Sequence, residues 1–337
     1  MYKYFVNKIV LMVLIMFVVT TVTFFIIRLL PGDPVFLWVG NHPTSKQLET
    51  ARKNLGYNEP LHKQYISFLN KITKLDFGVS LRTRQPVAYE LKKRFAATFE
   101  LVFFSILAAL ILGFPMGILS AIKERSLFDY IIRGIGYVGL SLPVFWLGMI
   151  LQIVFFGMLH LLPLQGRYDS AYYSESTIIG SSGFILIDSF FSAQWGLFFN
   201  GLQHIILPAT TMAFGVLGVI VRTARSAMLE TINEPFFKTF MSYGFDNIEI
   251  TKESAYKNIL IPVSTVAGLS FGLMLGGTFL VESIFDWPGL GQFSVLSILT
   301  SDFPAIIGIT FLYTFTYVII NFLIDVFYAL IDPRIHN

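Results

Sequence analysis

The sequence predicts an all-α membrane protein with six transmembrane helices. Of its 337 residues 55% are hydrophobic and only 13% are charged, and the mean hydropathy is +0.68. A soluble domain of this size is far less apolar. The formal net charge of +3 is too evenly balanced to favour a nucleic acid partner. The chain contains no cysteine, which excludes disulfides, thiolate metal sites and cysteine nucleophiles.

Long uncharged runs define the predicted spans, because a helix needs roughly 20 apolar residues to cross a hydrocarbon core of about 30 Å. Six such runs cover residues 9–27, 101–122, 134–159, 205–221, 259–281 and 303–324. The first run has no signal-peptide cleavage pattern after it, so we expect a retained first span. The fourth run is short, and its helix is expected to extend beyond both ends. Residues 184–199 are too few for a span and are expected to lie at the surface or interface.

The distribution of lysine and arginine predicts the orientation. If both termini lie in the cytoplasm, Arg167 is the one lysine or arginine in the two later outer loops. The long outer segment 31–98 also contains basic residues, but a loop of that length is exempt from the charge rule. The flanks predicted to be cytoplasmic contain Lys3, Lys8, Lys123, Arg125, Arg133, Arg222, Arg225, Lys238, Lys252, Lys257 and Arg334.

The outer segment 31–98 is predicted to fold as a small helical element. Thr44 and Gln47 have the spacing of a capping box, and Gly56 follows where a left-handed residue would end that helix. A second helix after Pro60 would either pack on the membrane part or contact a partner protein. Its apolar face would comprise Leu61, Tyr65, Phe68, Leu69 and Ile72.

Small residues and prolines predict how the spans pack. Gly268, Gly272 and Gly276 recur every four residues in the fifth run, which favours close approach of a neighbouring helix, with pore lining as the alternative. Pro115 and Pro143 are expected to kink the second and third spans, because proline removes a backbone donor and clashes with the preceding turn.

The chain offers little for catalysis, and we predict no catalytic residue, no cofactor and no metal site. GLSFG at 268–272 matches a serine hydrolase motif but lies in a membrane helix, and neither His160 nor His204 has an evident acid partner. The six runs contain no charged or histidine side chain, which disfavours an ion-coupled carrier. No Gly-Lys pair occurs, so the phosphate-binding P-loop is absent.

The longest predicted cytoplasmic loop, residues 223–258, interrupts the apolar runs. Glu234 and Pro235 can start a short helix that Gly244 would end, and such a helix is stable when it lies in a partner's groove or, alternatively, on the membrane surface. The helix would comprise Phe236, Phe237, Lys238, Thr239, Phe240, Met241, Ser242 and Tyr243.

Several blocks together resemble the first permease subunit of bacterial ATP-binding-cassette importers of the oligopeptide, dipeptide and nickel group. In that family a coupling helix ends at a glycine and a proline follows eighteen residues later, as Gly244 and Pro262 do here. Phe240 and Met241 replace the family's usual small residues. The matching blocks are RLLPGDP at 28–34, residues 58–87, 141–166 and 207–230, VESIFDWPGLG at 281–291, and the terminal YALIDPRI.

The resemblance implies a type I importer fold with a first helix at 1–30, an extracytoplasmic helical segment at 31–98, the remaining five helices at 99–330 and a cytoplasmic tail at 331–337. It implies a bacterial inner-membrane location, a second permease subunit, two ATPase subunits and an extracytoplasmic solute-binding protein. Residues 236–244 would contact the ATPase. The expected cargo is a dipeptide or oligopeptide, with nickel or another metal chelate as the alternative.

Overall fold

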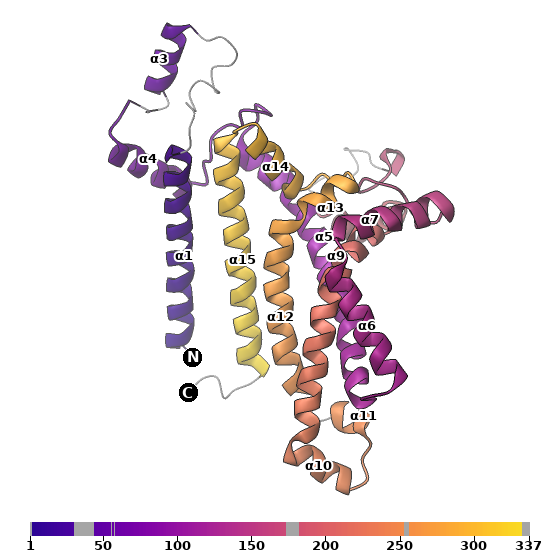
Figure 1. The fold of residues 1–337 in the computed structure, drawn as a ribbon. Helices are drawn as coiled ribbons and strands as arrows, with labels where there is room; N and C mark the ends of the chain where they lie inside the picture. Colours follow the sequence, from indigo (N-terminus) through magenta and orange to yellow (C-terminus); the bar gives the residue numbers. More distant parts are fainter. Residues whose placement is uncertain are drawn as a thin grey trace. The chain divides into compact units, whose positions relative to one another are not determined.

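The computed structural model describes residues 2–29, 44–54, 56, 58–172, 182–252 and 256–331, and these residues are helical apart from loops and one isolated bridge between Val79 and Pro86. Five helices are long and apolar enough to cross a membrane, and a bent pair makes a sixth if it counts as one span. The all-α prediction is therefore confirmed. The five helices are α1 (Tyr2–Leu29), α5 (Val87–Ile122), α9 (Trp195–Asn233), α12 (Tyr256–Gly277) and α15 (Phe303–Ile331) (Figure 1).

The chain divides into two compact units. Unit 1 comprises residues 1–96 and 289–318, and unit 2 comprises residues 97–288 and 319–337. The boundary passes within α5 and α15, whereas the sequence-based ranges with ends at 30, 98 and 330 stay a prediction. Most of the RLLPGDP block and the tail 332–337 lie outside the described residues.

Unit 1 contains the predicted outer helices α3 (Ser45–Asn54) and α4 (Leu61–Thr73). The capping box before α3 is present, because Thr44 N–H donates to Gln47 Oε1 at 2.9 Å and Gln47 N–H donates to Thr44 Oγ1 at 3.4 Å. Tyr65 and Phe68 of α4 pack on α1, with ring centroids 5.3 and 5.0 Å from Phe24. The apolar face of α4 is thus covered in part by the first span.

The rest of unit 1 is built around a buried acid that precedes α15. Asp302 accepts hydrogen bonds from the Ser80 hydroxyl, from Arg82 N–H at 3.3 Å and from Ala305 N–H at 3.4 Å. These bonds tie the loop before α5 to the start of α15. The adjoining core includes Val87, Leu91, Leu290, Phe293, Ala305 and Ile309, two of them from α14 (Leu290–Leu299).

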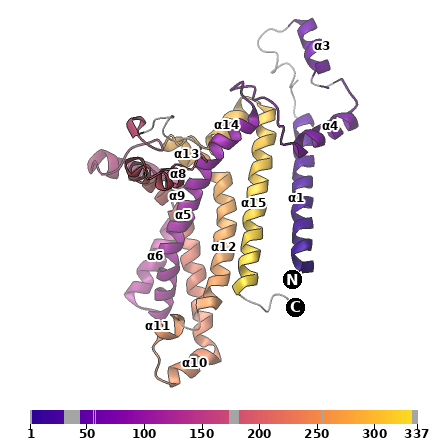
Figure 2. The ribbon, with the colours of Figure 1, turned by 180° about the vertical axis from the view of Figure 1, so that it is seen from behind.

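Unit 2 is built around α9, against which α5, α6 (Leu127–Ser141) and α12 pack (Figure 2). Glycines allow the closest approaches. A Cβ at Gly117 of α5 would lie 2.7 Å from Val221 O, and a Cβ at Gly139 of α6 would lie 2.6 Å from Phe214 O. A Cβ at Gly218 would overlap the carbonyl oxygen of Gly136 in α6. These helices therefore pack backbone to backbone, as small residues permit in membranes.

The third apolar run does not form a straight span. Helix α6 ends at Ser141, and the chain turns by 107° into α7 (Val144–Leu151) and the π-helical η1 (Gln152–Met158). Leu142 is extended and Pro143 caps α7, because a residue before proline avoids the helical conformation. The predicted kink at Pro143 is a break, whereas α5 continues as one helix through Pro115.

Shorter helices complete unit 2. Three of them are η2 (Ser170–Tyr172), α8 (Ile185–Phe191) and α13 (Phe279–Ile284), and two more follow α9. The segment 184–199 therefore holds α8 and the beginning of α9, which starts at Trp195 and extends the fourth run at both ends. Ile185 and Leu186 of α8 are buried against the rest of unit 2.

Candidate functional site

The loop after α9 begins with a sharp change of direction. Asn233 is the last residue of α9, Glu234 is extended, and Pro235 is the first residue of α10 (Pro235–Ser242). Proline suits this first position, because its missing N–H would have no partner in the first turn and its φ is already helical. Helices α10 and α11 lie beyond the end of α9 (Figure 1).

The end of α10 is a Schellman motif around Gly244. The glycine has φ +92, its N–H donates to Met241 O at 3.0 Å, and Phe245 N–H donates to Phe240 O at 3.3 Å. The Phe240 and Phe245 rings meet edge to face at 5.7 Å, which is the apolar contact that accompanies this motif. Gly244 therefore occupies the left-handed position that glycine adopts without steric cost.

A second short helix, α11 (Asn247–Ile250), returns the chain toward the core. It starts with a capping box in which Glu249 N–H donates to Asp246 Oδ1 at 2.7 Å and Asp246 N–H donates to Glu249 Oε2 at 3.0 Å. Ile250, at the end of α11, is buried. Both short helices thus have their own capping, although each is too short to be stable alone.

The apolar side chains of this loop differ sharply in burial. Phe237 is 1% exposed and lies in the core of unit 2 with Met228, Ile250 and Ile259, and Phe236 packs beside that core. We call the exposed apolar part of this loop the α10–α11 surface. It consists of exposed apolar side chains of Phe240, Met241, Tyr243, Phe245 and Ile248.

The predicted coupling residues thus serve different purposes in the chain. Phe237 anchors α10, and Gly244 ends it. Lys238, Thr239 and Ser242 are exposed with the apolar surface. Phe245 and Ile248 were missed by the sequence analysis, although an aromatic residue directly after a helix-ending glycine is a signal for the apolar contact of a Schellman motif.

The three spaced glycines of α12 have different surroundings. A Cβ at Gly268 would overlap Ile324 Cδ1 of α15, whereas one at Gly276 would have open space around it. Gly272 is half-buried. Close helix packing is therefore seen at Gly268, and a packing role for the whole stripe stays a prediction.

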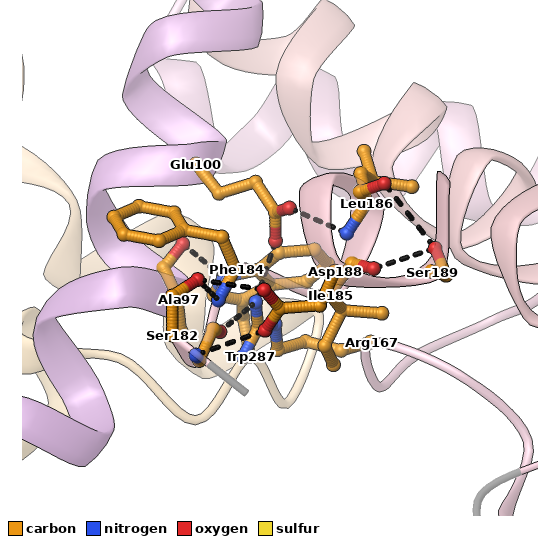
Figure 3. Close-up of polar contacts among 11 residues, drawn as sticks. Ala97, Glu100, Arg167, Ser182, Phe184, Ile185, Leu186, Asp188, Ser189 and Trp287 are labelled. Carbon is orange, nitrogen blue, oxygen red and sulfur yellow. Dashed lines mark hydrogen bonds and ion pairs between the residues drawn. The ribbon is translucent and has the colours of Figure 1, made fainter. Parts of the chain in front are cut away.

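A second feature of unit 2 is a buried ion pair, which Figure 3 shows. Glu100 and Arg167 are 3% and 9% exposed, and the Arg167 guanidinium donates to Glu100 Oε2. Leu186 N–H donates to Glu100 Oε1 at 2.8 Å. The guanidinium lies 5.5 Å from the Trp287 ring centroid, and Trp287 Nε1–H donates to Ala97 O at 2.8 Å. We call these five residues the Glu100–Arg167 network.

One histidine does have an acid neighbour, contrary to the sequence-based expectation. His204 Nε2 lies 3.5 Å from Asp169 Oδ1, and Nδ1 lies 3.0 Å from Gln165 O. Asn200 also donates to Asp169, at 2.7 Å. These contacts join the loop before η2 to α9. Among the described residues no group of three or more His, Asp or Glu side chains is arranged to hold a metal ion.

Comparison with known proteins identifies the family. The family described as "Binding-protein-dependent transport system inner membrane component" matches residues 113–337, and its N-terminal domain matches residues 1–102. The chain is 40% identical to the probable D,D-dipeptide transport system permease of Escherichia coli K12, covering 96% of this chain and 94% of the relative. It is 37% identical to the di/tripeptide transport system permease of Pseudomonas aeruginosa UCBPP-PA14, covering 95% of each.

A solved structure shares the fold. The chain superimposes on a chain of the inward-facing MetNI methionine ABC transporter with a TM-score of 0.50 at 13% identity, covering 70% of this chain and 93% of that one. At this identity the likeness concerns the fold alone. The family match, the relatives and the helical architecture agree with the resemblance seen in the sequence: this multi-pass membrane protein belongs to the inner-membrane permease family of binding-protein-dependent ABC importers.

Proposed function

We propose that this chain is one of two permease subunits of an ATP-driven importer of dipeptides or oligopeptides, and that a cytoplasmic ATPase subunit binds the α10–α11 surface. The α10–α11 surface is the observation that supports ATPase binding. Its large apolar side chains are exposed although they lie outside the membrane-spanning helices, and they gather on one short segment that Phe237 anchors to the core. A helix laid in a partner's groove would cover them.

The anchoring suggests how coupling would operate. Phe237 fixes α10 to the core that α9 and α12 share, so a displacement of α10 by the ATPase would be carried to those two spans. Conformational change in such systems requires a packed element with discrete arrangements. The sequence has no P-loop, so ATP hydrolysis is assigned to the partner subunits.

The substrate assignment rests on the relatives. Those at 40% and 37% identity are named for D,D-dipeptide and di/tripeptide transport, and another, at 32% identity, is named for glutathione transport. We assign the same chemical class here, a short peptide delivered by an extracytoplasmic binding protein. A metal chelate is the alternative that a competition experiment must exclude.

Two buried carboxylates of unit 2 argue against ion-coupled transport. Glu100 and Asp129 are buried, and each is hydrogen-bonded to an arginine, Arg167 and Arg225 respectively. A carboxylate that carries a coupling proton must release its partner during the cycle, which such pairs oppose.

The test is reconstitution of the chain with the proposed second permease, two ATPase subunits and a solute-binding protein. Uptake of a labelled dipeptide should require ATP on the ATPase side and should survive dissipation of ion gradients. A nickel chelate should compete weakly. Uptake that proceeds without the ATPases, or that collapses with the ion gradient, would overturn the assignment.

The orientation has its own test. Because the chain lacks cysteine, single cysteines at the exposed positions Ser67 and Ser242 can be labelled with a membrane-impermeant maleimide. We expect labelling of Ser67→Cys in intact cells and of Ser242→Cys only in inverted vesicles. Labelling of both from the same side would contradict the cytoplasmic placement of the α10–α11 surface.

A further inference from the structure

A cavity of about 290 Å³ opens where α6 crosses α9. The crossing is close, since Gly136 and Gly218 meet backbone to backbone. Beside these glycines the cavity wall carries Arg133 and Tyr137 from α6 and Arg222 from α9. Its size is near the lower end of small-ligand sites, which suits a compact polar group.

One arginine of the cavity wall, Arg225, already forms an ion pair within the chain. Arg225 donates from Nε to Asp129 Oδ1 at 2.8 Å and from Nη2 to Asp129 Oδ2 at 3.0 Å. Asp129 is fully buried and also accepts from the Ser120 hydroxyl and from Arg125 N–H at 3.1 Å. Its oxygens are therefore occupied, and this carboxylate does not compensate the other arginines.

Arg133 and Arg222 are differently placed. Neither is within ion-pair distance of an acid in the described part of the chain, and the Arg133 guanidinium has only the Tyr130 ring at 5.8 Å. The one carboxylate on the cavity wall, Glu124, lies 3.9 Å from Arg225. A cavity with two uncompensated guanidiniums and the Tyr137 hydroxyl favours an oxyanion, and the planar guanidinium fork matches phosphate.

The surroundings of the cavity are amphipathic. Arg222 follows directly after the uncharged run 205–221, so it lies where the apolar stretch of α9 ends. Tyr137 and Leu140 of α6, which also line the cavity, are 58% and 45% exposed. Phosphate-bearing amphiphiles combine these two chemistries, and basic pockets between membrane helices are known to hold anionic lipid headgroups.

We propose that this cavity binds the phosphate of an anionic lipid headgroup in the leaflet nearest α10. The same guanidiniums would also bind free phosphate, because the chemistry that the two ligands share is the phosphate oxyanion. The exposed apolar wall beside the arginines favours the lipid. This proposal is independent of the cargo and of ATPase binding.

Native mass spectrometry of the full chain in detergent tests it, with phosphatidylglycerol and phosphatidylcholine of identical acyl chains as probes. The wild type should retain phosphatidylglycerol preferentially. Loss of one cationic contact should weaken this retention about fivefold in Arg133→Gln, and loss of two about 30-fold in the Arg133→Gln/Arg222→Gln double variant. Arg225 is left intact because it holds Asp129. Unchanged thermal unfolding of the variants would show that they are folded.

The matched control removes the same charge elsewhere, as Lys92→Gln/Lys93→Gln on exposed positions of α5. Retention that falls in the arginine double variant but not in this control supports the site. Displacement of the lipid by inorganic phosphate at millimolar concentration would assign the cavity to free phosphate and overturn the lipid assignment. No preference in the wild type, or equal losses in the arginine variant and the lysine control, would overturn the proposal.

Discussion

The regions at the two ends of α9 contain opposite kinds of unusual side chains: buried charges at one end and exposed apolar groups at the other. Near its first residues, the Glu100–Arg167 network buries two charges and gives each a partner within the chain. Beyond its last residues, the α10–α11 surface exposes large apolar side chains and leaves them uncovered by the chain. A buried charge and an exposed apolar patch are both departures from ordinary burial. Only the buried charges have partners within the chain. The exposed apolar surface is therefore the region that another molecule must cover.

The network should show the largest effect. Arg167→Met would leave Glu100 buried without its cation, and Glu100→Gln would leave Arg167 without its anion. Removing one partner of a buried pair costs about 3 to 5 kcal/mol, so either variant should lower the free energy of unfolding by that order. The double variant should recover part of the loss, because no charge is left uncompensated.

Denaturant unfolding of the purified chain in detergent measures these effects. The matched control is the exposed pair Lys63 and Glu59, whose charged atoms lie 3.3 Å apart. Breaking that pair should cost below about 0.5 kcal/mol, because exposed pairs are screened. Equal losses at both pairs would show that burial does not strengthen the network.

Substitution of Phe237 should show the next largest effect. It distinguishes the side chain that anchors α10 from the side chains of the exposed surface. Phe237→Ala would open a cavity in the core of unit 2 and should lower the free energy of unfolding by about 3 kcal/mol. Phe240→Ala, on the same helix but 36% exposed, should change it far less. Equal destabilisation by the two substitutions would mean that α10 has no distinct buried face.

Local patterns predicted much of the fold. The uncharged runs located the spans, the Thr44 and Gln47 spacing located the start of α3, and a glycine after the partly apolar stretch 236–243 located the end of α10. Each of these is set by backbone hydrogen bonding within a few residues. The 107° turn at Pro143 was underestimated as a kink. A sequence shows where a donor is missing but does not show how neighbouring helices hold the two halves.

Long-range pairs were beyond the sequence. Glu100 and Arg167 are separated by 67 positions, and nothing local to either indicates the other. The glycine stripe of α12 drew attention because of its regular spacing, yet the closest backbone approaches to α9 involve Gly117, Gly139 and Gly218. Gly117 belongs to the α5–α9 pair, and Gly139 and Gly218 belong to the α6–α9 pair, so a periodic pattern within one helix cannot reveal these contacts.

Phe240→Asp tests the exposed α10–α11 surface. A carboxylate at the centre of an apolar contact would lose its hydration without gaining a partner, and hot-spot residues of interfaces contribute about 2 kcal/mol or more. The isolated chain should unfold as the wild type does. ATPase binding should weaken about 30-fold or more, and transport and substrate-stimulated ATP hydrolysis should fall together. Ile66→Asp, on the exposed face of α4, is the control and should leave ATPase binding unchanged.

The smallest effect is expected at Gly244, where the surface depends on one backbone conformation. With φ +92 and no heavy atom within 4 Å of the position that a Cβ would take, a side chain would be opposed by backbone strain rather than by a clash within the chain. Gly244→Val should cost about 1 to 2 kcal/mol and separate Phe245 from Phe240, because β-branched residues tolerate the left-handed region poorly. Gly244→Asn should retain most activity, since asparagine adopts that region more readily. Transport and ATP hydrolysis by the reconstituted complex, measured with subunit assembly, distinguish the cases. Loss of both in the valine variant alone identifies the conformation as the requirement, whereas equal loss in both variants would mean that any side chain there obstructs the partner.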